Sequence, residues 1–375
     1  MFPPWRTSCA ATRSNRDQET VLPGPSPGGI ALVKASFFRE HGDLEKIQYG
    51  DLPDPVPGPG QVRVRVRAGA LNRLDIFVRN GIPGISLSLP HVMGSDGAGI
   101  VDSVGPGVTR VKEGDEVVLN PGIHCGVCEF CLRGEHSLCV TFHLLGEHVW
   151  GTFAETVVAP AINAYPKPQG LTWEESAAFP LTFLTAWRML VTKAKAKPGE
   201  SLLVIGIGGG VSLAALQIGK MLGLTIGVTS GSADKLRRAG EMGVDFGIDH
   251  GKGDFASETR KITGKRGVDI VLDSVGKATW KQSIAALARG GRLLTCGATT
   301  GPNPEEDIAR IFWNQLTVMG SSMGTHAEFS DLLRMVSGGR VRPVVDSVFP
   351  LSEAKEAHRR LVDQKQFGKI VLRVD

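Results

Sequence analysis

Residues 201–212 read SLLVIGIGGGVS, and this stretch decides the fold. An apolar run, Leu202–Gly206, leads into four closely spaced glycines, and a second apolar run follows at Leu213–Leu222. A glycine cluster between two apolar runs predicts a strand, a tight turn and a helix. Residues 201–219 carry no charge and have the roughly 17–25 residues of a membrane-spanning helix. The glycines in their middle exclude that interpretation.

The chain on the C-terminal side of this turn alternates strand-like and helix-like segments. Six strands alternating with helices predict a doubly wound parallel sheet, which we place at residues 181–322. The predicted strands are Leu202–Gly206, Thr225–Thr229, Asp245–Ile248, Asp269–Asp273, Arg292–Cys296 and Leu316–Met319. The predicted helices include Leu213–Leu222, Lys235–Met242 and Lys281–Ala288.

Residues 30–180 have a different pattern, of short strands separated by turns. Gln61–Ala70 (QVRVRVRAGA) alternates valine with arginine, which predicts a strand with one buried face. Gly94–Val108 and Gly114–Leu119 continue the β pattern. Residues 323–375 are expected to return to this domain, with helices at Phe329–Val336 and Glu353–Leu361 and a strand at Ile370–Val374.

Composition limits the partners and the location. The 375 residues carry a formal net charge of only +4, which indicates neither nucleic acid nor a membrane surface as a partner. Residues 1–29 combine five prolines with three arginines and lack an uninterrupted apolar stretch, so a secretory signal is not expected. We expect a disordered extension and a cytoplasmic protein, with an organellar transit peptide as the alternative.

The glycine turn predicts a dinucleotide site. Glycines between a buried strand and a helix let backbone N–H groups approach a pyrophosphate at the helix N-terminus. Gly297, directly after a predicted strand of the same sheet, is a further candidate. The candidate cofactor residues of these two segments are Gly206, Gly208, Gly209, Gly210, Val211 and Gly297. A glycine hinge that only packs the helix on the sheet is the alternative.

The end of the second strand distinguishes NAD from NADP. An NAD site usually has an acidic residue there to bind the ribose hydroxyls. This chain has Ser230 and Ser232 instead, followed by Lys235, Arg237 and Arg238. Hydroxyl groups and cations accept a 2′-phosphate, so the sequence predicts NADP(H). For each of the three cations, a solvated helix face is the alternative.

Four of the six cysteines lie close together, at Cys125, Cys128, Cys131 and Cys139. Four thiolates satisfy a tetrahedral zinc ion and leave no open position, which is the signature of a structural site. We predict one structural Zn²⁺ in a lobe at about residues 121–145. An iron–sulfur cluster and two disulfides are the alternatives.

At this point the chain resembles the zinc-type alcohol dehydrogenases of the medium-chain dehydrogenase/reductase superfamily. The resemblance runs from about residue 30 to residue 375. It depends on the glycine pattern at 94–108, the cysteine lobe and the glycine turn about seventy residues later. It implies a GroES-like catalytic domain, a Rossmann domain and a cleft between them, and by analogy a dimer or tetramer.

The chain departs from that family at its catalytic zinc. The positions of the three principal ligands hold Asn72, Ser95 and Leu181, and Asp96 takes the place of a nearby glutamate. The residues that relay the alcohol proton are replaced as well, by Leu74 and Phe77. A dehydrogenase that oxidises an unactivated alcohol needs a Lewis acid to generate an alkoxide.

Acceptors that are already polarised for hydride attack do not need that metal. The pattern is similar to the quinone oxidoreductase and enone reductase branch, whose Asn-x-x-Asp motif matches Asn72 and Asp75. That branch often has a tyrosine where this chain has Phe77, and its best-known members lack the cysteine lobe. The resemblance implies an NADPH-dependent reductase of quinones or α,β-unsaturated carbonyls.

The expected roles follow from this resemblance. Asn72 would donate a hydrogen bond to the substrate or the cofactor, beside Asp75, unless it is only a turn residue bonding its own backbone. Ser95 and Thr182 would line the substrate pocket. Thr185 matches the family's nicotinamide-contacting threonine, although a hydroxyl in a helix interior would look identical in sequence. The proton would come from water.

Two other functions stay open. One is a zinc-dependent alcohol dehydrogenase that holds its metal with Asp75, Asp96, His91 or His148. The other is a protein that binds NADPH without catalysis.

Overall fold

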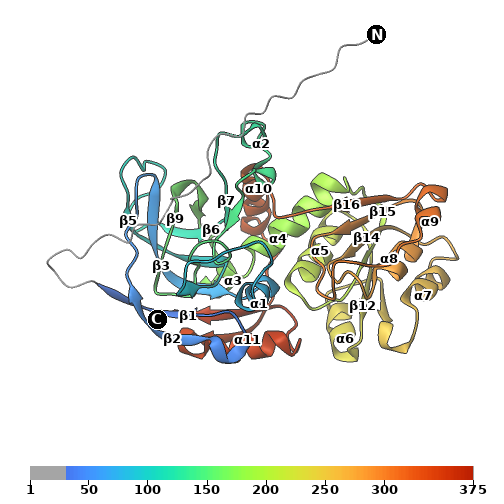
Figure 1. The fold of residues 1–375 in the computed structure, drawn as a ribbon. Coiled ribbons are helices and arrows are strands. Elements are labelled where there is room, and N and C mark those ends of the chain that lie inside the picture. The colour runs from blue at the N-terminus through green and yellow to red at the C-terminus, as the bar shows by residue number, and fades with distance from the viewer. Residues whose placement is uncertain (1–30, 375) are drawn as a thin grey trace, which may run out of the picture.

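The computed structural model describes residues 31–374, in two parts that lie side by side (Figure 1). One part is rich in β-strands and contains both the N-terminal half of the chain and its last strands. The other is a parallel sheet with helices on both faces. The predicted fold class, a β-rich domain joined to a doubly wound α/β domain, is confirmed. The extension at 1–29, with Cys9, lies outside the described residues.

The β-rich part contains two main sheets. The larger runs in the order β10-β6-β5-β3-β18-β17 with β9 also paired to β3, and the smaller in the order β2-β1-β4. Its strands are β1 (Leu32–Phe38), β2 (Gln48–Pro53), β3 (Gln61–Ala70), β4 (His91–Val92), β5 (Asp96–Val104), β6 (Glu116–Leu119), β9 (Thr156–Pro160), β10 (Ala164–Pro166), β17 (Val345–Pro350) and β18 (Lys369–Arg373). Its helices are α1 (Arg73–Asn80), α3 (Trp173–Ala177) and α11 (Ala354–Val362).

Strand β3 buries one of its two faces, as its alternation of valine and arginine predicts. Val62, Val64 and Val66 are almost fully buried in the core of this part. Arg63 points to the other face, where its guanidinium pairs with Asp54 and Asp102. Burying one face fixes the register of the strand, because a shift of one residue would turn the valines to solvent.

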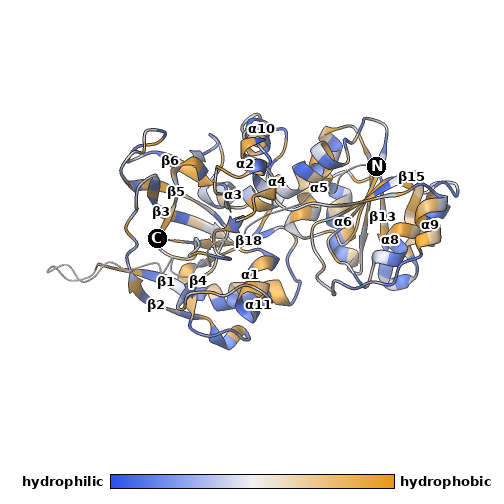
Figure 2. Cartoon of the chain, turned by 45° about the horizontal axis from the view of Figure 1, so that its top comes forward, coloured by the Kyte–Doolittle hydropathy of each residue, from blue (hydrophilic) through white to orange (hydrophobic). Residues whose placement is uncertain are grey.

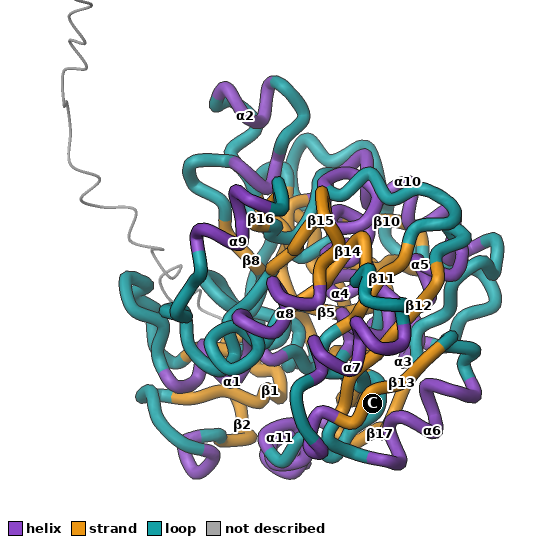
Figure 3. Tube along the Cα trace, turned by 90° about the vertical axis from the view of Figure 1, so that its right-hand side faces the viewer, coloured by secondary structure: helices purple, strands orange, loops and turns teal. Residues whose placement is uncertain are grey.

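The parallel sheet has six strands in the order β13-β12-β11-β14-β15-β16 (Figure 3). In chain order this is 3-2-1-4-5-6, the arrangement of dinucleotide-binding folds. The strands are β11 (Ser201–Val204), β12 (Thr225–Ser230), β13 (Phe246–Asp249), β14 (Val268–Asp273), β15 (Leu287–Thr295) and β16 (Thr317–Gly320). The helices are α4 (Pro180–Trp187), α5 (Gly210–Met221), α6 (Ala233–Glu241), α7 (Phe255–Ile262), α8 (Trp280–Ala286) and α9 (Ile308–Trp313). The stretch 201–219 is strand, turn and helix, and no described helix is long and apolar enough to cross a membrane.

Most predicted boundaries differ from the structure by a few residues, and the largest difference is at the start of β15. β15 begins at Leu287 rather than at Arg292, and the preceding helix α8 ends at Ala286. The pairing with β14 shifts register between Val268 and Ile270, where Gly290 adopts a φ of +73°. β15 has extra residues at this bulge that have no partner in β14. Because the bulge contains glycines, the apolar pattern alone placed the start of the strand too late.

After β16 the chain returns to the β-rich part through α10 (His326–Ser337). β18 pairs with β3, with Val371 opposite Ala70, and this brings Lys369 beside the segment that begins at Asn72. We propose domain boundaries at 30–180, 181–322 and 323–375.

A small lobe projects above α10 (Figure 1). It is built from short elements: β7 (Gly122–Ile123), α2 (Glu129–Leu132), η2 (His136–Leu138) and β8 (His143–Leu144). Arg188, which is 2% exposed, connects the lobe to the rest of the protein through ion pairs with Glu135 of the lobe and Glu328 of α10.

Candidate active site and metal centre

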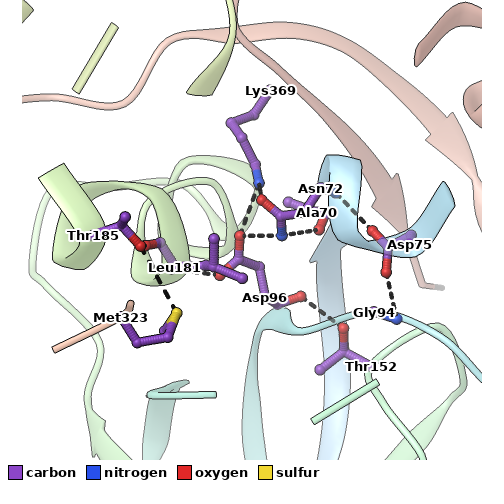
Figure 4. Close-up of polar contacts among 10 residues, drawn as sticks. All are labelled: Ala70, Asn72, Asp75, Gly94, Asp96, Thr152, Leu181, Thr185, Met323 and Lys369. Atoms are coloured by element: carbon purple, nitrogen blue, oxygen red, sulfur yellow. Dashed lines mark hydrogen bonds and ion pairs between the residues drawn. The ribbon is translucent and has the colours of Figure 1, made fainter. Parts of the chain in front are cut away.

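The carboxylate of Asp96 is the centre of a buried polar network (Figure 4). Its Oδ2 accepts hydrogen bonds from Asn72 Nδ2 at 2.9 Å and from Lys369 Nζ at 2.8 Å. Its Oδ1 accepts one from the backbone N–H of Leu181 at 2.7 Å. Lys369 also donates to Asn72 Oδ1 at 2.6 Å. The network therefore joins four separate segments of the chain. Asn72 is itself a predicted catalytic residue, and Asp96 and Leu181 are each next in sequence to one, Ser95 and Thr182.

Asn72 is the N-cap residue that precedes helix α1, and it is almost completely buried. Its side-chain N–H groups lie 2.9 Å from Asp96 Oδ2 and 3.4 Å from the carbonyl oxygen of Ala70. Both donors are thus engaged inside the protein. A hydrogen bond from Asn72 to a substrate would have to replace one of them.

Asp75 stabilises the same region from the first turn of α1. Its carboxylate accepts hydrogen bonds from the backbone N–H groups of Asn72 at 2.6 Å and Gly94 at 3.1 Å. Burial raises the pKa of Asp75 to about 7, although these hydrogen bonds and the charge of Lys369 act to lower it. Asp75 therefore fixes the segments on either side of the network.

Ser95 directly precedes Asp96, and Thr182 directly follows Leu181. Both therefore lie next to the hydrogen bond between Asp96 and Leu181. Both are buried, and their hydroxyl oxygens have no hydrogen-bond partner among residues 31–374. Most buried hydroxyls are paired, so a bound acceptor atom would supply the partner that these two lack. Thr185, one helical turn beyond Thr182, donates to the carbonyl oxygen of Leu181 at 2.7 Å and contacts Met323. It thus has the contacts of an ordinary helix-interior hydroxyl.

The glycine turn lies directly against the network. Gly206 and Gly208 have φ angles of +72° and +116°, which other residues rarely adopt. A Cβ atom on Gly210 would lie 2.6 Å from Thr182 Cγ2 and 3.0 Å from Lys369 Cδ. Helix α5 begins at Gly210, while Val211 packs against the apolar core. The first N–H groups of a helix have no partner within it, so the turn can hold an anion.

The residues predicted to bind the 2′-phosphate gather at the end of β12. Ser230 accepts a hydrogen bond from the backbone N–H of Ser232, and the Ser232 side chain caps α6. Lys235 reaches back over the turn, where its Cδ is 3.0 Å from the position of a Cβ on Gly208. Its ammonium donates to the carbonyl oxygen of Gln364 at 2.6 Å, and burial lowers its pKa.

Arg237 and Arg238 do not join this group. Arg237 is exposed and pairs with Asp234 and Glu241, and the Arg238 guanidinium stacks on Phe367. Asp234 is the acid nearest in sequence to the end of β12, and it is engaged with Arg237.

Gly297 lines a separate cavity of about 330 Å³ at the carboxyl ends of β15 and β16. The cavity also touches the cysteine lobe at Ser137 and Leu138. Thr182, beside Gly210, and Arg188, at the cavity, are six residues apart, or about 9 Å of helix. Thr182 is in α4, and Arg188 directly follows its last residue.

The four cysteines form a group suited to a metal ion. Their sulfur atoms all lie within 4.8 Å of one another, and those of Cys125 and Cys131 are 3.9 Å apart. Tetrahedral zinc with Zn–S bonds of about 2.3 Å requires sulfur atoms about 3.8 Å apart. The backbone N–H groups of Cys125 and Cys128 donate hydrogen bonds to the sulfur atoms of Cys139 and Cys125. These four residues fit a structural zinc ion.

The histidines considered for a second metal site lie elsewhere. His91 is buried with Nε2 3.1 Å from the carbonyl oxygen of Gly146, and burial lowers its pKa to about 4. His148 accepts a hydrogen bond from the backbone N–H of Leu144 and pairs with Glu147. Within residues 31–374 only the four cysteines gather three or more metal-binding atoms closely.

Sequence reasoning missed Lys369 and the central position of Asp96. The available signal was a lysine directly before three apolar residues in the strand Lys369–Arg373. Its partners are 273 and 297 residues away in sequence, so only the pairing of β18 with β3 identified them.

Two family models match consecutive parts of the chain. An alcohol dehydrogenase GroES-like domain matches residues 58–169, and a zinc-binding dehydrogenase domain matches residues 210–338. Together with the fold, these matches show that the chain belongs to the medium-chain dehydrogenase/reductase superfamily, among its alcohol dehydrogenase-like and quinone oxidoreductase-like members. It is an oxidoreductase of that superfamily, whose members bind a nicotinamide cofactor.

Individual relatives cover nearly the whole chain. A zinc-type alcohol dehydrogenase-like protein of Schizosaccharomyces pombe is 35% identical over 82% of this chain and 89% of its own length. The human quinone oxidoreductase is 27% identical over 92% of this chain and 98% of its own. A crystal structure of an NAD-dependent alcohol dehydrogenase is 47% identical with a TM-score of 0.88, covering 91% of this chain and 100% of that one.

Proposed function

We propose that this protein is an NADPH-dependent oxidoreductase that transfers hydride to quinones or α,β-unsaturated carbonyls without a catalytic zinc. The observation that supports this most is the Lys369 ammonium, which is bonded to both Asn72 and Asp96. These are two of the positions that surround the catalytic zinc in zinc alcohol dehydrogenases. A fixed positive charge there opposes a divalent cation, and Ser95 and Leu181 offer no strong ligand in its place.

The class of hydride acceptor follows from the replacement of the zinc ligands. Without a Lewis acid, an unactivated alcohol is a poor substrate near neutral pH. A quinone or an enone carries its own electron sink, because conjugation moves the incoming charge onto an oxygen. NADPH, when bound, supplies the hydride.

The residues of the chain would bind and orient both reactants. The glycine turn and the start of α5 would hold the diphosphate, with Lys369 supplying positive charge beside Gly210. Ser230, Ser232 and Lys235 would hold the 2′-phosphate. The hydroxyls of Ser95 and Thr182 would donate hydrogen bonds to the acceptor oxygen as its charge develops, and water would supply the proton.

Asn72 and Asp75 would act by positioning. Asn72 orients Asp96 and Lys369, and Asp75 holds the backbone at Asn72 and Gly94. Thr185 remains a candidate contact of the nicotinamide, and we propose the same role for Gly297, which the sequence indicated only as a cofactor contact. Family membership supports these assignments. NADPH rather than NADH is favoured by Ser230 and Ser232, which lie at the end of β12 where an NAD site usually has an acid.

The four cysteines would bind one structural zinc ion, and free thiols of this kind suit a reducing, cytoplasmic environment. The protein would form a homo-oligomer with contacts at the outer end of the parallel sheet. There β16 is an edge strand, and the largely hydrophobic helix α9 lies at the same end of the molecule (Figure 2). Three large apolar side chains of α9 are exposed. These are Ile308, Phe312 and Trp313, which are 64–71% exposed.

The test is a substrate panel. Purified protein is assayed with NADPH and NADH against quinones and enones, and with NADP⁺ against primary alcohols, after its zinc content has been measured. Consumption of NADPH with conjugated acceptors, no alcohol oxidation and about one zinc per chain are expected. Cofactor binding without any turnover would instead indicate a non-catalytic protein.

An alcohol dehydrogenase is the second candidate, because the 47% identical structure bears that name. It predicts alcohol oxidation with NAD⁺ and a second metal ion per chain, so the same panel separates the two candidates.

A further inference from the structure

The cavity at the carboxyl ends of β15 and β16 has the size of a substrate site. Its volume of about 330 Å³ is within the range of small-molecule pockets. It includes Gly297, our candidate nicotinamide contact, and extends from there to Leu138 of the cysteine lobe. A substrate beside the cofactor would therefore extend into it.

Two basic residues line this cavity, and no acidic residue does. Arg188 and Lys193 are the ends of η4 (Arg188–Lys193), a π-helical segment that continues α4. In a π-helix residue i bonds to residue i+5, as the Ala194 N–H does to the Met189 carbonyl oxygen at 2.9 Å. Residues five apart, such as Arg188 and Lys193, then lie on the same side of the helix. Both side chains line the cavity.

The two cations differ in their availability. Arg188 is buried and engaged by the carboxylates of Glu135 at 2.6 Å and Glu328 at 2.9 Å. Lys193 is half-buried and forms no ion pair with any residue of 31–374. Its ammonium is therefore the cation that a ligand in the cavity can use.

A hydroxyl with no partner lies on the same wall. Ser321 Oγ is buried and makes no hydrogen bond to any residue in the described part of the chain. An unpaired ammonium together with an unpaired hydroxyl donor suits an anion with several acceptor oxygens, such as a carboxylate or a phosphate. The neighbouring Leu138 provides an apolar surface for the chain that carries it.

We propose that the physiological substrate is a conjugated carbonyl compound that also carries an anionic group, and that Lys193 and Ser321 bind that group. This inference rests on the proposed function and deepens it. Lys193 and Ser321 are specificity determinants here, because they contact the substrate away from the reacting carbon.

The test compares two acceptors that differ only in charge. One is an α,β-unsaturated ketone with a carboxylate at the end of its alkyl chain, and the other is the matching primary amide. The wild-type protein should have at least about tenfold higher kcat/KM for the carboxylate. Lys193→Met, which removes the charge and keeps the apolar stem, should abolish that preference by lowering kcat/KM for the carboxylate toward the value for the amide.

Lys197→Met is the matched control, because Lys197 is exposed and does not line the cavity. Ser321→Ala should lower the preference severalfold. A phosphate-bearing ketone in place of the carboxylate distinguishes the two anion types. Equal kcat/KM for charged and neutral acceptors in the wild type, or a preference that survives in Lys193→Met, would overturn the inference.

Calorimetric titration of both ketones into the NADP⁺ complex separates this inference from the proposed function. Charge-dependent binding without any turnover would contradict only the proposed function. Turnover with equal binding of the two ketones would contradict only the anion site.

Discussion

Lys369 Nζ lies 2.8 Å from Asp96 Oδ2, and both side chains are buried, at 4% and 0% exposure. The two residues are 273 positions apart in sequence. They meet because β18, the last strand, pairs with β3 in the sheet that also contains β5. This ion pair gives the candidate active site a resident positive charge next to the glycine turn.

Lys369→Met should destabilise the protein, because it leaves the Asp96 carboxylate buried without its counter-charge. The free energy of unfolding, measured by urea denaturation, should fall by about 3–5 kcal/mol. Lys365→Met is the control, since Lys365 forms an exposed pair with Asp363. In the double variant Lys369→Met/Asp96→Asn part of the loss should be recovered, and a strictly additive loss would argue against the pair as the cause.

Asp75→Asn should change how stability depends on pH. Burial raises the pKa of the Asp75 carboxyl from its ordinary value of 3.8 to about 7, so the folded state holds its proton to higher pH. Between these values the wild-type unfolding free energy should decrease as pH rises, by up to about 1.4 kcal/mol per pH unit. Asn cannot ionise, so the variant should lack this decrease. Urea titrations at several pH values between 5 and 8 measure it, with exposed Glu113→Gln as the control. Identical pH dependence of the unfolding free energy in wild type and Asp75→Asn would contradict a raised pKa of Asp75 in the folded protein.

Lys235→Gln should reduce the preference for NADPH. The charge near the 2′-phosphate is lost, so kcat/KM for NADPH should fall about tenfold or more while kcat/KM for NADH stays within about twofold. Arg237→Gln is the matched control on the same helix, because Arg237 is already paired with Asp234 and Glu241. A similar loss with both cofactors would mean that Lys235 supports the turn rather than the phosphate.

Cys131→Ser should remove the structural metal. Elemental analysis should find about one zinc per chain in the wild type and much less in the variant, because three thiolates hold zinc less tightly than four. Cys296→Ser should keep the metal, since Cys296 lines the cavity at the end of β15 instead. Visible absorption of the purified protein would point to an iron–sulfur cluster in place of zinc.

Trp313→Glu should dissociate the oligomer. The Trp313 side chain is 70% exposed at the open edge of the parallel sheet, and a carboxylate there would be desolvated on assembly. Light scattering coupled to size-exclusion chromatography should show a smaller particle than the wild type. Val127→Glu, at an exposed site on the cysteine lobe, should leave the mass unchanged. A monomeric wild type would contradict the proposed interface.

Local sequence patterns determined the elements of this fold. The glycine turn after an apolar run predicted β11 and α5, and the valine–arginine alternation predicted β3, because each signal depends on neighbours within a few residues. The cysteine spacing likewise predicted a group that the structure brings within bonding range of one ion. The bulge that starts β15 at Leu287 escaped prediction, since it depends on pairing with β14.

Tertiary structure alone decided what the candidate residues contact. Sequence identified Asn72 as a polar residue at a position where zinc enzymes have a ligand, and the fold engaged its side chain with Asp96 and Lys369. It also left the hydroxyls of Ser95 and Thr182 unpaired and brought Lys193 to a cavity beside Ser321. Sequence spacing does not encode such contacts, because they arise where strands and helices from distant parts of the chain pack together.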